Sequence, residues 1–254
     1  MREIYQKGVV VDLKGKVVLV TGGARRIGRS ISLALGEKGA NVIINYNASA
    51  EQAEEAKRKV EALGARAMTV QADVSKAAQV DRMVDEAVAA FGRIDVLINN
   101  AAIFYKTPFL ELTEEHWDDF MSINLKGPFL CARKIGELML KQGSGKIINI
   151  ADVSGVRPWA PYIPYCVSKA GVIMLTKVLA KALAPNIQVN AVSPGPVLLP
   201  EYYGEKEAEQ AIKNTVLKRV GSPEDIARTV IFLIEGSDYI TGEVIAVDGG
   251  RLIA

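Results

Sequence analysis

Short apolar runs recur along the chain, separated by longer stretches in which apolar and polar residues mix. Each run is five or six residues long, is rich in Val and Ile, and shows little alternation of apolar and polar positions. Strands buried on both faces have this pattern, so each run predicts such a strand. The predicted strands are Val17–Thr21, Asn41–Tyr46, Ala67–Ala72, Ile94–Asn99, Lys146–Ala151, Ile187–Val192 and Glu243–Val247.

The stretches between these runs predict amphipathic helices. Arg26–Lys38 carries apolar residues at helical spacing, and Ala50–Leu63 is rich in Glu, Lys and Ala. Lys76–Phe91 follows Ser75, a suitable N-cap, and precedes Gly92, a suitable helix stop. Strands that alternate with helices indicate β-α-β crossovers, and therefore an α/β fold with a Rossmann-like, doubly wound parallel sheet and helices on both faces.

A chain of 254 residues suits one large α/β domain or two small ones. No linker or change in composition divides it, so we predict a single domain over residues 1–254, with a tail at 1–14. The least regular stretch, Pro194–Lys206, is rich in Pro, Gly and Tyr and follows a predicted strand. Ligands bind at the carboxyl ends of strands in such sheets, so we interpret about residues 194–215 as a mobile substrate lid, with a plain surface loop as the alternative.

The composition, 49% hydrophobic and 24% charged with a net charge of +2, indicates a buried core and gives little support for a nucleic-acid partner. Cys131 and Cys166 lie in no C-x-x-C or Cys/His cluster, which indicates a reduced compartment and no metal site. The chain start lacks a leader pattern, and no apolar run approaches the ~18 residues that a membrane span needs. We therefore expect a soluble, cytoplasmic protein with a small-molecule substrate.

The first predicted strand runs into a glycine-rich turn that opens a helix, Thr21-Gly22-Gly23-Ala24-Arg25-Arg26-Ile27-Gly28. Such a turn brings free backbone N–H groups and the positive end of a helix dipole close to a pyrophosphate. An ordinary strand-to-helix turn is the alternative. The candidate cofactor-binding residues here are Gly22, Arg25, Arg26, Ile27 and Gly28.

The end of the second predicted strand favours NADPH over NADH. An enzyme that uses NAD usually places Asp or Glu there to bind the ribose 2′-hydroxyl. This strand is followed by Asn47-Ala48-Ser49, and the first acid is Glu51. Asn47 and Ser49, with Arg25 and Arg26 from the turn, supply the donors and positive charge that a 2′-phosphate needs.

Two further strand ends would complete the cofactor site. Asp73, which Val74 follows, is placed to accept from the adenine amino group, although a helix N-cap role suits it equally well. Asn99-Asn100-Ala101 would place Asn100 and Ala101 beside a ribose, and a polar strand-terminal turn is the alternative.

Tyr165 and Lys169 are four residues apart, which places them on one face of a helix. A nearby ammonium stabilises a tyrosinate, so we expect Lys169 to lower the pKa of Tyr165 from its reference of about 10. Such a phenol can donate a proton as a hydride arrives. We interpret Cys166 as a packing residue, and His116, in an acidic helix start capped by Thr113, as a surface residue.

With these motifs the chain resembles the short-chain dehydrogenase/reductase family over nearly all of its length. Asn124, Ser193-Pro194-Gly195 and the C-terminal Thr241-Gly242 and Val247-Asp248-Gly249-Gly250 also match. The resemblance implies a sheet of seven parallel strands and, usually, a homotetramer. It also implies that Asn124 holds a helix bulge and a water that relays protons toward Lys169, and that Pro194 and Gly195 border the cofactor.

Two positions depart from the general family pattern. Most members carry a catalytic serine thirteen residues before the tyrosine, but this chain has Asp152 there, and Ser154 is out of register. Arg26 replaces the middle glycine of the turn. Both departures resemble the pteridine reductase subfamily, and so does Phe104 after the fourth predicted strand. That resemblance implies that Phe104 stacks on a pterin sandwiched against the nicotinamide, and that Arg26 reaches both a cofactor phosphate and the pterin.

The chemistry of these residues agrees with a flat heterocyclic substrate. An aromatic ring and a nicotinamide hold such a ring well. A carboxylate at Asp152 would raise the pKa of Tyr165, opposing Lys169, and the two groups would titrate as a coupled pair. The alternatives are a surface carboxylate for Asp152 and an ordinary core aromatic for Phe104.

We therefore expect NADPH-dependent reduction of a pterin or dihydropterin C=N bond. Tyr165 would protonate the nitrogen, with Asp152, Lys169, Asn124 and water as the relay. The first alternative is a carbonyl reductase, for instance of 3-oxoacyl groups on a carrier protein; Asp152 and Phe104 oppose it, and a basic patch beside the cleft would favour it. The second is a non-catalytic NADPH-binding regulator, which the intact Tyr165/Lys169 pair opposes.

Overall fold

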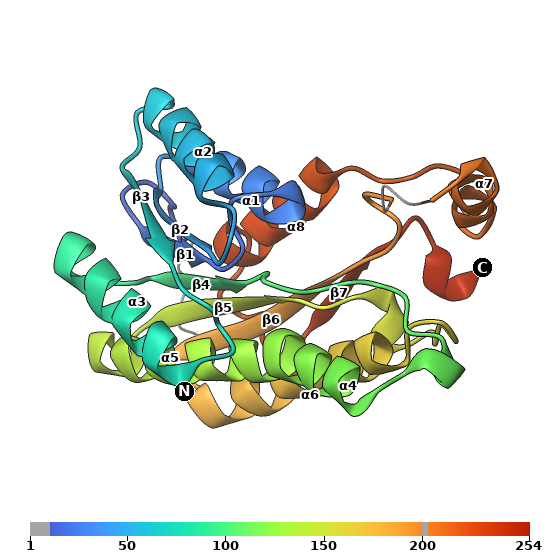
Figure 1. Ribbon diagram of the computed structural model, residues 1–254. Coiled ribbons are helices and arrows are strands. Elements are labelled where there is room, and N and C mark those ends of the chain that lie inside the picture. Colours follow the sequence, from blue (N-terminus) through green and yellow to red (C-terminus); the bar gives the residue numbers. More distant parts are fainter. Residues whose placement is uncertain (1–10, 200–202) are drawn as a thin grey trace, which may run out of the picture.

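A sheet of seven parallel strands crosses the molecule in the order β3-β2-β1-β4-β5-β6-β7 (Figure 1). The computed structural model describes residues 11–199 and 203–254, so most of the predicted tail at 1–14 lies outside the described residues. The doubly wound α/β fold is confirmed. The strands are β1 (Val17–Val20), β2 (Asn41–Tyr46), β3 (Ala67–Gln71), β4 (Val96–Asn99), β5 (Gly145–Ile150), β6 (Ile187–Pro194) and β7 (Val244–Val247).

Helices cover both faces of the sheet (Figure 1). One face carries α1 (Arg26–Glu37), α2 (Ala50–Ala62) and α8 (Pro223–Glu235), and the other carries α3 (Ala77–Phe91), α5 (Gly127–Gln142) and α6 (Ile163–Leu183). Two shorter helices, α4 (Glu114–Phe120) and α7 (Glu205–Lys213), lie toward the carboxyl ends of the strands. None of the helices in the described ranges is long and apolar enough to cross a membrane.

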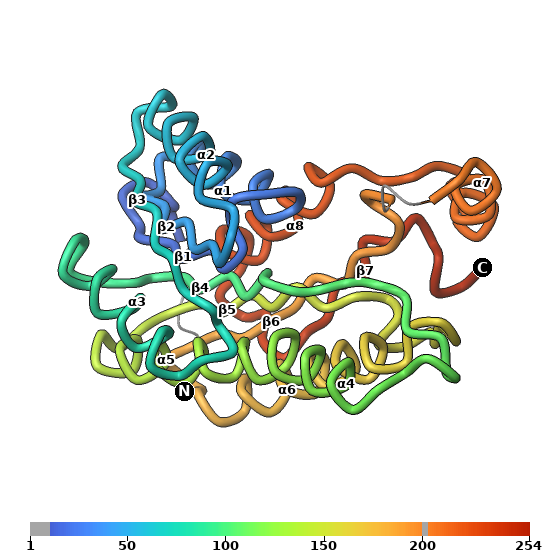
Figure 2. The backbone as a smooth tube through the Cα atoms, in the orientation of Figure 1, coloured from blue at the N-terminus to red at the C-terminus, as the bar shows by residue number. Residues whose placement is uncertain are grey.

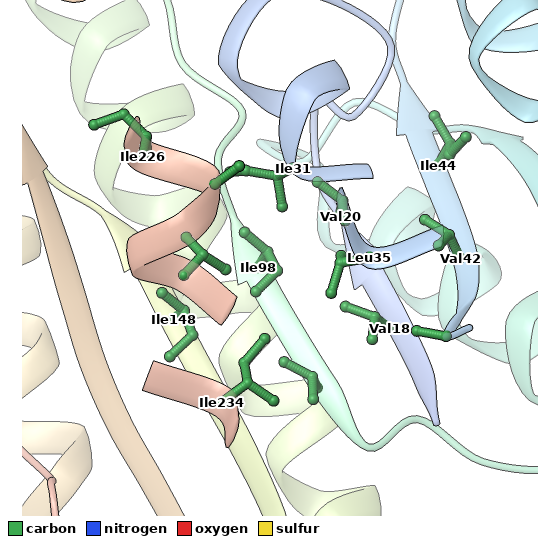
Figure 3. Packing of buried hydrophobic residues seen from close by; sticks show 14 of the residues in the cluster. Val18, Val20, Ile31, Leu35, Val42, Ile44, Ile98, Ile148, Ile226 and Ile234 are labelled. Atoms are coloured by element: carbon green, nitrogen blue, oxygen red, sulfur yellow. The ribbon is translucent and has the colours of Figure 1, made fainter. Parts of the chain in front are cut away.

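Both faces of the central strands are apolar, because successive side chains point to opposite sides and each side meets a helical layer. Figure 3 shows one of these layers, where strand side chains pack against α1 and α8. On the opposite face Leu19, Ile43, Leu97 and Ile147 pack with residues of α3 and α5. The first layer includes Val18, Val20, Val42, Ile44, Ile98 and Ile148 from the strands, with Ile31, Leu35, Ile226 and Ile234 from the helices.

The observed helix ends test two predicted boundaries. Gly92 ends α3 in the left-handed conformation, with φ of 75° and its N–H bonded to Val88, as predicted. The Ser75 cap is wrong: Lys76 is the N-cap residue, and the Ser75 N–H instead donates to Asp73 Oδ1 at 2.9 Å. The short turn closed by the Asp73 side chain therefore displaces the helix start by one residue.

The strand order reverses between β1 and β4, and the carboxyl ends of the strands on either side of this point face one opening. Pairing of β6 with β7 continues to Pro194, which aligns with Val247. The sixth strand is therefore longer than predicted, and it carries Pro194 to the edge of the opening.

Candidate active site

A pocket of about 850 Å³ lies at the carboxyl ends of the strands. Its wall contains all of the predicted cofactor and substrate residues, and of the predicted catalytic residues only Asn124 is absent from it. Residues from almost the whole chain thus meet in one cavity at the switch point of the sheet. They are Gly22, Arg25, Arg26, Ile27, Gly28, Asn47, Ser49, Asp73, Val74, Asn100, Ala101, Phe104, Asp152, Tyr165, Lys169, Pro194 and Gly195.

The glycine-rich turn is fastened to the end of β4. Thr21 Oγ1 accepts from the N–H groups of Asn100, at 2.9 Å, and Ala101, at 3.1 Å. The Asn100 amide donates in return to the Thr21 and Gly22 carbonyls. A Cβ added at Gly28 would lie 2.2 Å from the Gly22 carbonyl oxygen, so only glycine fits there. This close packing leaves a bare backbone cradle of the kind that a pyrophosphate occupies.

Arg26 adopts a left-handed backbone conformation, with φ of 50°, at the position where the family pattern has glycine. This conformation costs a residue with a Cβ more than it costs glycine. The Arg26 side chain donates from Nη2 to the Leu198 carbonyl at 3.1 Å, and so joins the turn to the segment after β6. Arg25 is exposed as the N-cap residue of α1.

Asn45, which the sequence analysis did not single out, organises the second strand end. Its Oδ1 accepts from the Gly22 N–H at 3.2 Å, and its Nδ2 donates to the Ala72 carbonyl at 3.0 Å. A buried asparagine in the apolar run Asn41–Tyr46 was the available signal, because buried amides need partners. Ser49, the N-cap residue of α2, has no side-chain capping bond.

Asp73 is not a helix N-cap, the alternative given for it above, because Lys76 caps α3; its side chain closes a short turn before that helix instead. Its Oδ1 accepts from the Ser75 N–H at 2.9 Å, and its own N–H donates to Gln79 Oε1 at 2.8 Å. These bonds hold the carboxylate on the pocket wall beside Val74.

Tyr165, Lys169 and Asp152 meet where β5 ends and α6 begins. The Tyr165 hydroxyl donates to Asp152 Oδ2 at 3.0 Å. Lys169 Nζ donates to the Ile150 carbonyl at 2.8 Å and lies 5.7 Å from the centroid of the Tyr165 ring. The carboxylate and the ammonium thus approach the phenol from different elements.

Burial dominates the protonation of these groups. It raises the pKa of Tyr165 well above its ordinary value, and the neighbouring Asp152 carboxylate raises it further. The expected lowering by Lys169 is therefore wrong in direction. Burial also raises the pKa of Asp152. It lowers the pKa of Lys169 to about 8, and the negative charge of Asp152 partly opposes this second shift. At neutral pH the phenol keeps its proton and can only donate it.

Asn124 lies in a π-helical turn, η2 (Met121–Lys126), between α4 and α5. Its Oδ1 accepts from the Ile103 N–H at 2.9 Å, and its Nδ2 donates to the Ile103 carbonyl at 3.1 Å. The same Nδ2 donates to Ser168 Oγ at 3.3 Å, on the helix that carries Tyr165. Asn124 thus ties the segment after β4 to α6 from behind the pocket wall.

Three aromatic rings, those of Phe104, Trp159 and Tyr162, surround Tyr165 on the pocket wall. Phe104 and Tyr162 stack with centroids 4.8 Å apart and planes 5° apart. The edge contact between Phe104 and Tyr165 spans 4.7 Å, and Trp159, missed by the sequence analysis, packs against the other two rings and Tyr165. One face of Phe104 is therefore covered by Tyr162, so a flat substrate could stack on at most the opposite face.

Cys166 and His116 have local roles. Cys166 Sγ accepts from the Trp159 N–H at 3.4 Å and donates to the Trp159 carbonyl at 3.8 Å, which fixes the loop that carries this indole. His116 is partly exposed at the start of α4, which agrees with the surface position expected for it, and its ring packs against that of Tyr105. Its Nδ1 accepts from the N–H of Thr113, the confirmed N-cap of α4.

The segment after β6 borders the pocket on its remaining side. A Cβ at Gly195 would lie 2.6 Å from the Asp248 Cα, so glycine is required there. Residues 200–202 of the predicted lid lie outside the described residues. Beyond them α7 places Glu207, Gln210 and Asn214 on the pocket wall.

One family model and two relatives of the same name match nearly the whole chain. A family model described as enoyl-(acyl carrier protein) reductase matches residues 22–251. The 3-oxoacyl-(acyl-carrier-protein) reductase of Staphylococcus aureus is 43% identical over 239 residues, which are 92% of this chain and 97% of the relative. The enzyme of the same name from Synechocystis is 40% identical over 244 residues, covering 95% of this chain and 98% of the relative.

Two solved structures of dehydrogenase/reductases are also similar to this chain. A short-chain dehydrogenase/reductase from Serratia marcescens superimposes with a TM-score of 0.90 at 34% identity, covering 95% of this chain and all of that one. A dehydrogenase/reductase from Sinorhizobium meliloti gives a TM-score of 0.89 at 34% identity, with 95% and 97% covered.

Proposed function

Since the chain belongs to the short-chain dehydrogenase/reductase family of oxidoreductases, we propose that it is an NADPH-dependent reductase in which Tyr165 protonates the substrate. The observation that carries this proposal is the buried Tyr165 hydroxyl, 3.0 Å from Asp152 Oδ2, in the cavity that also holds the glycine-rich turn. When bound, the cofactor supplies the hydride.

The residues on the wall fit a phosphorylated dinucleotide. The backbone cradle at Gly22 and Gly28, where no Cβ fits, suits the pyrophosphate. Arg25, Asn47 and Ser49 would take the 2′-phosphate, because the Ser49 hydroxyl has no capping bond and the α2 N-terminus favours an anion. The remaining contacts would come from Arg26, Ile27, Asp73, Val74, Asn100, Ala101, Tyr165, Lys169, Pro194 and Gly195.

Proton transfer follows from the order of the groups. Tyr165 is protonated at neutral pH and donates to the substrate atom that becomes electron-rich. Asp152 accepts the Tyr165 hydrogen bond as a carboxylate; because burial raises its pKa, it would take up a proton from solvent and pass it to the phenolate. Lys169 stabilises that phenolate while its ammonium is charged, and Asn124 holds the backbone behind both.

We propose that the substrate is a 3-oxoacyl thioester, whose ketone is reduced to a hydroxyl. The names of the relatives from Staphylococcus aureus and Synechocystis support this first alternative of the sequence analysis. None of the comparisons supports pterin reduction, the function that the sequence analysis placed first. The apolar and aromatic wall around Tyr165 also suits the acyl part of such a substrate.

A pterin remains the second candidate because of Asp152. In a serine-type site the group beside the tyrosine donates a hydrogen bond, whereas the Asp152 carboxylate accepts one from Tyr165. A protonated tyrosine that donates to a carboxylate can protonate a ring nitrogen of a substrate as well as a ketone oxygen. The aromatic side chains of Phe104 and Tyr162 would contact a flat ring.

The test is a comparison of substrates with the purified protein. NADPH oxidation is followed with acetoacetyl-coenzyme A, dihydrobiopterin and dihydrofolate. We expect turnover of the thioester; turnover of a pterin with an inert thioester would reverse the order of the two candidates. Tight NADPH binding without oxidation by any of the three would instead support the non-catalytic regulator.

We also propose that residues 1–254 form a single domain in which about residues 194–215 act as a substrate lid. The Arg26 bond to the Leu198 carbonyl supports this, since it links the lid to the cofactor turn. If the segment is a lid, bound NADPH should protect it from limited proteolysis. A plain surface loop should be cleaved equally with and without NADPH.

A further inference from the structure

The last described residues fold into a short turn that reaches the pocket. This turn, η4 (Arg251–Ile253), is closed by the Asp248 carboxylate, which accepts from the N–H groups of Gly250, at 2.9 Å, and Leu252, at 2.8 Å. Figure 2 shows the C-terminal end of the chain close to α7. Arg157, from the loop after Asp152, donates from Nη1 to the Arg251 and Ala254 carbonyls at 2.6 Å each, and so fixes the turn against that loop.

The Arg251 side chain lines the pocket that contains Tyr165. It is half-buried and donates from Nη1 to the Asn214 carbonyl, at the end of α7, at 3.2 Å. This is its one hydrogen bond to the described residues, so most of its guanidinium N–H groups have no protein acceptor there.

No described residue forms an ion pair with Arg251. Burial lowers the pKa of Arg251, and the charge of Arg157, another cation, lowers it further. A partly buried guanidinium without an anion is costly, and the nearby positive charge adds to that cost. The arrangement is stabilised when an anion enters the pocket.

The neighbouring face of α7 offers amide groups and one acid. Gln210 Nε2 donates to Asn214 Oδ1 at 3.0 Å, and both side chains are on the pocket wall. Glu207, one turn earlier, also reaches the wall, but its carboxylate accepts from the Gly204 N–H at 3.2 Å and forms no ion pair with Arg251. Arg251 therefore supplies the positive charge beside Gln210 and Asn214, whose side chains are uncharged.

We propose that Arg251, with Gln210 and Asn214 beside it, binds an anionic group on a part of the substrate other than the bond that is reduced. A guanidinium held by backbone contacts suits bidentate recognition of either a carboxylate or a phosphate. The inference rests on the proposed function only in that the ligand shares the pocket with Tyr165. It adds a charged recognition element to the pocket that also holds the aromatic rings of Phe104, Trp159 and Tyr162.

The experiment compares ligands that differ in the anion alone. Binding of 4′-phosphopantetheine and pantetheine, and of folic acid and its glutamyl diamide, is measured by calorimetry on the NADP⁺-loaded protein. The first pair tests a phosphate and the second a carboxylate. We expect the charged member of at least one pair to bind about tenfold more tightly than its neutral partner, which corresponds to about 1.4 kcal/mol.

Two variants locate the effect. Arg251→Gln should bring the ratio of the two dissociation constants close to one, and Arg251→Lys should retain part of it. The matched control is Arg219→Gln, because Arg219 is exposed, pairs with Asp225 and lies outside this pocket; it should keep the wild-type ratio. Equal binding of charged and neutral ligands by the wild type, or an unchanged ratio in Arg251→Gln, would overturn the inference.

These ratios are obtained without turnover, so they separate the inference from the proposed function. If no substrate oxidises NADPH but the ratio depends on Arg251, the reductase proposal fails and the anion site stands. If substrates are reduced but the ratio of dissociation constants is unchanged in Arg251→Gln, the reductase proposal stands and the anion site fails.

Discussion

At the scale of single residues, protonation in the site is decided by burial more than by charge. Tyr165 and Lys169 are both buried, and their pKa values move in the directions that favour the neutral forms. The spacing in the sequence predicted that the two side chains share a helix face. It could not predict how deeply each side chain is buried. Desolvation depends on Phe104, Trp159 and the other rings packed around them, which come from distant segments.

The pH dependence of reduction follows from these shifts. The pKa of Lys169 is about 8, so its ammonium is lost as the pH rises through about 8, well below the ordinary range for lysine. We expect kcat/KM for reduction to fall across that interval. Asp152 raises the pKa of Lys169, so Asp152→Asn should move the fall to lower pH. An alkaline limb at the ordinary lysine pKa, or one that Asp152→Asn leaves in place, would contradict this assignment.

At the scale of elements, the hydrophobic pattern located each of the seven strands to within two residues at both ends. Local pattern failed at one competing turn and at one long-range contact. Ser75 lost the cap to a turn closed by Asp73, and Asn45 acquired its role from Gly22 and Ala72, which only the folded sheet brings near. Buried polar residues inside apolar runs were the one local sign of such contacts.

The fit of the glycine-rich turn to its surroundings can be tested with two helical glycines. Gly28→Ala should greatly weaken NADPH binding and lower the melting temperature, because the new Cβ would lie 2.2 Å from the Gly22 carbonyl oxygen. Gly136→Ala in α5 is the matched control. Its Cβ would meet only Leu183, at 3.7 Å, so stability should be unchanged or higher by up to about 1 kcal/mol. Fluorescence titration with NADPH and thermal unfolding measure both; equal behaviour of the two variants would contradict the close fit.

Cofactor preference is a property of the β2 end and the α2 N-terminus together. Asn47→Asp places a carboxylate where a 2′-phosphate would bind, so the ratio of kcat/KM for NADPH to that for NADH should fall by about tenfold or more. Asn186→Asp makes the same change just before β6, four strands away from β2 in the sheet, and should leave the ratio unchanged. Comparable wild-type kcat/KM values for the two cofactors would contradict the assignment.

At the scale of the whole molecule, topology was predictable, but the convergence of distant segments was recognised only through motifs. The alternation of strands and helices predicts which strand ends share one edge, and the pocket lies there. Trp159 and Arg251 were missed because they are placed by Cys166 and Arg157 through contacts that no motif encodes. The homotetramer that the family resemblance implies stays a proposal, supported by exposed apolar side chains on α5 and α6 such as Phe129, Met174 and Val178.

Assembly can be tested on that surface. Met174 and Val178 are more than half exposed and lie one helical turn apart on α6. If they are covered in a homotetramer, assembly of the double variant Met174→Glu and Val178→Glu would bury two unpaired charges in each subunit. We therefore expect this variant to form smaller species. Light scattering coupled to size exclusion measures the mass. A wild-type monomer, or a variant with the wild-type mass, would contradict assembly through this face.

The most direct test of the central claim, that Tyr165 delivers the proton in an NADPH-dependent reduction, is single-turnover NADPH oxidation by Tyr165→Phe with acetoacetyl-coenzyme A. Removal of a positioned general acid typically costs about 10²–10⁴ in rate, so the variant should bind NADPH normally and oxidise it slower by about that factor. Tyr239→Phe, at a tyrosine that is 96% exposed, should match the wild type. Oxidation by Tyr165→Phe at the wild-type rate would contradict the account.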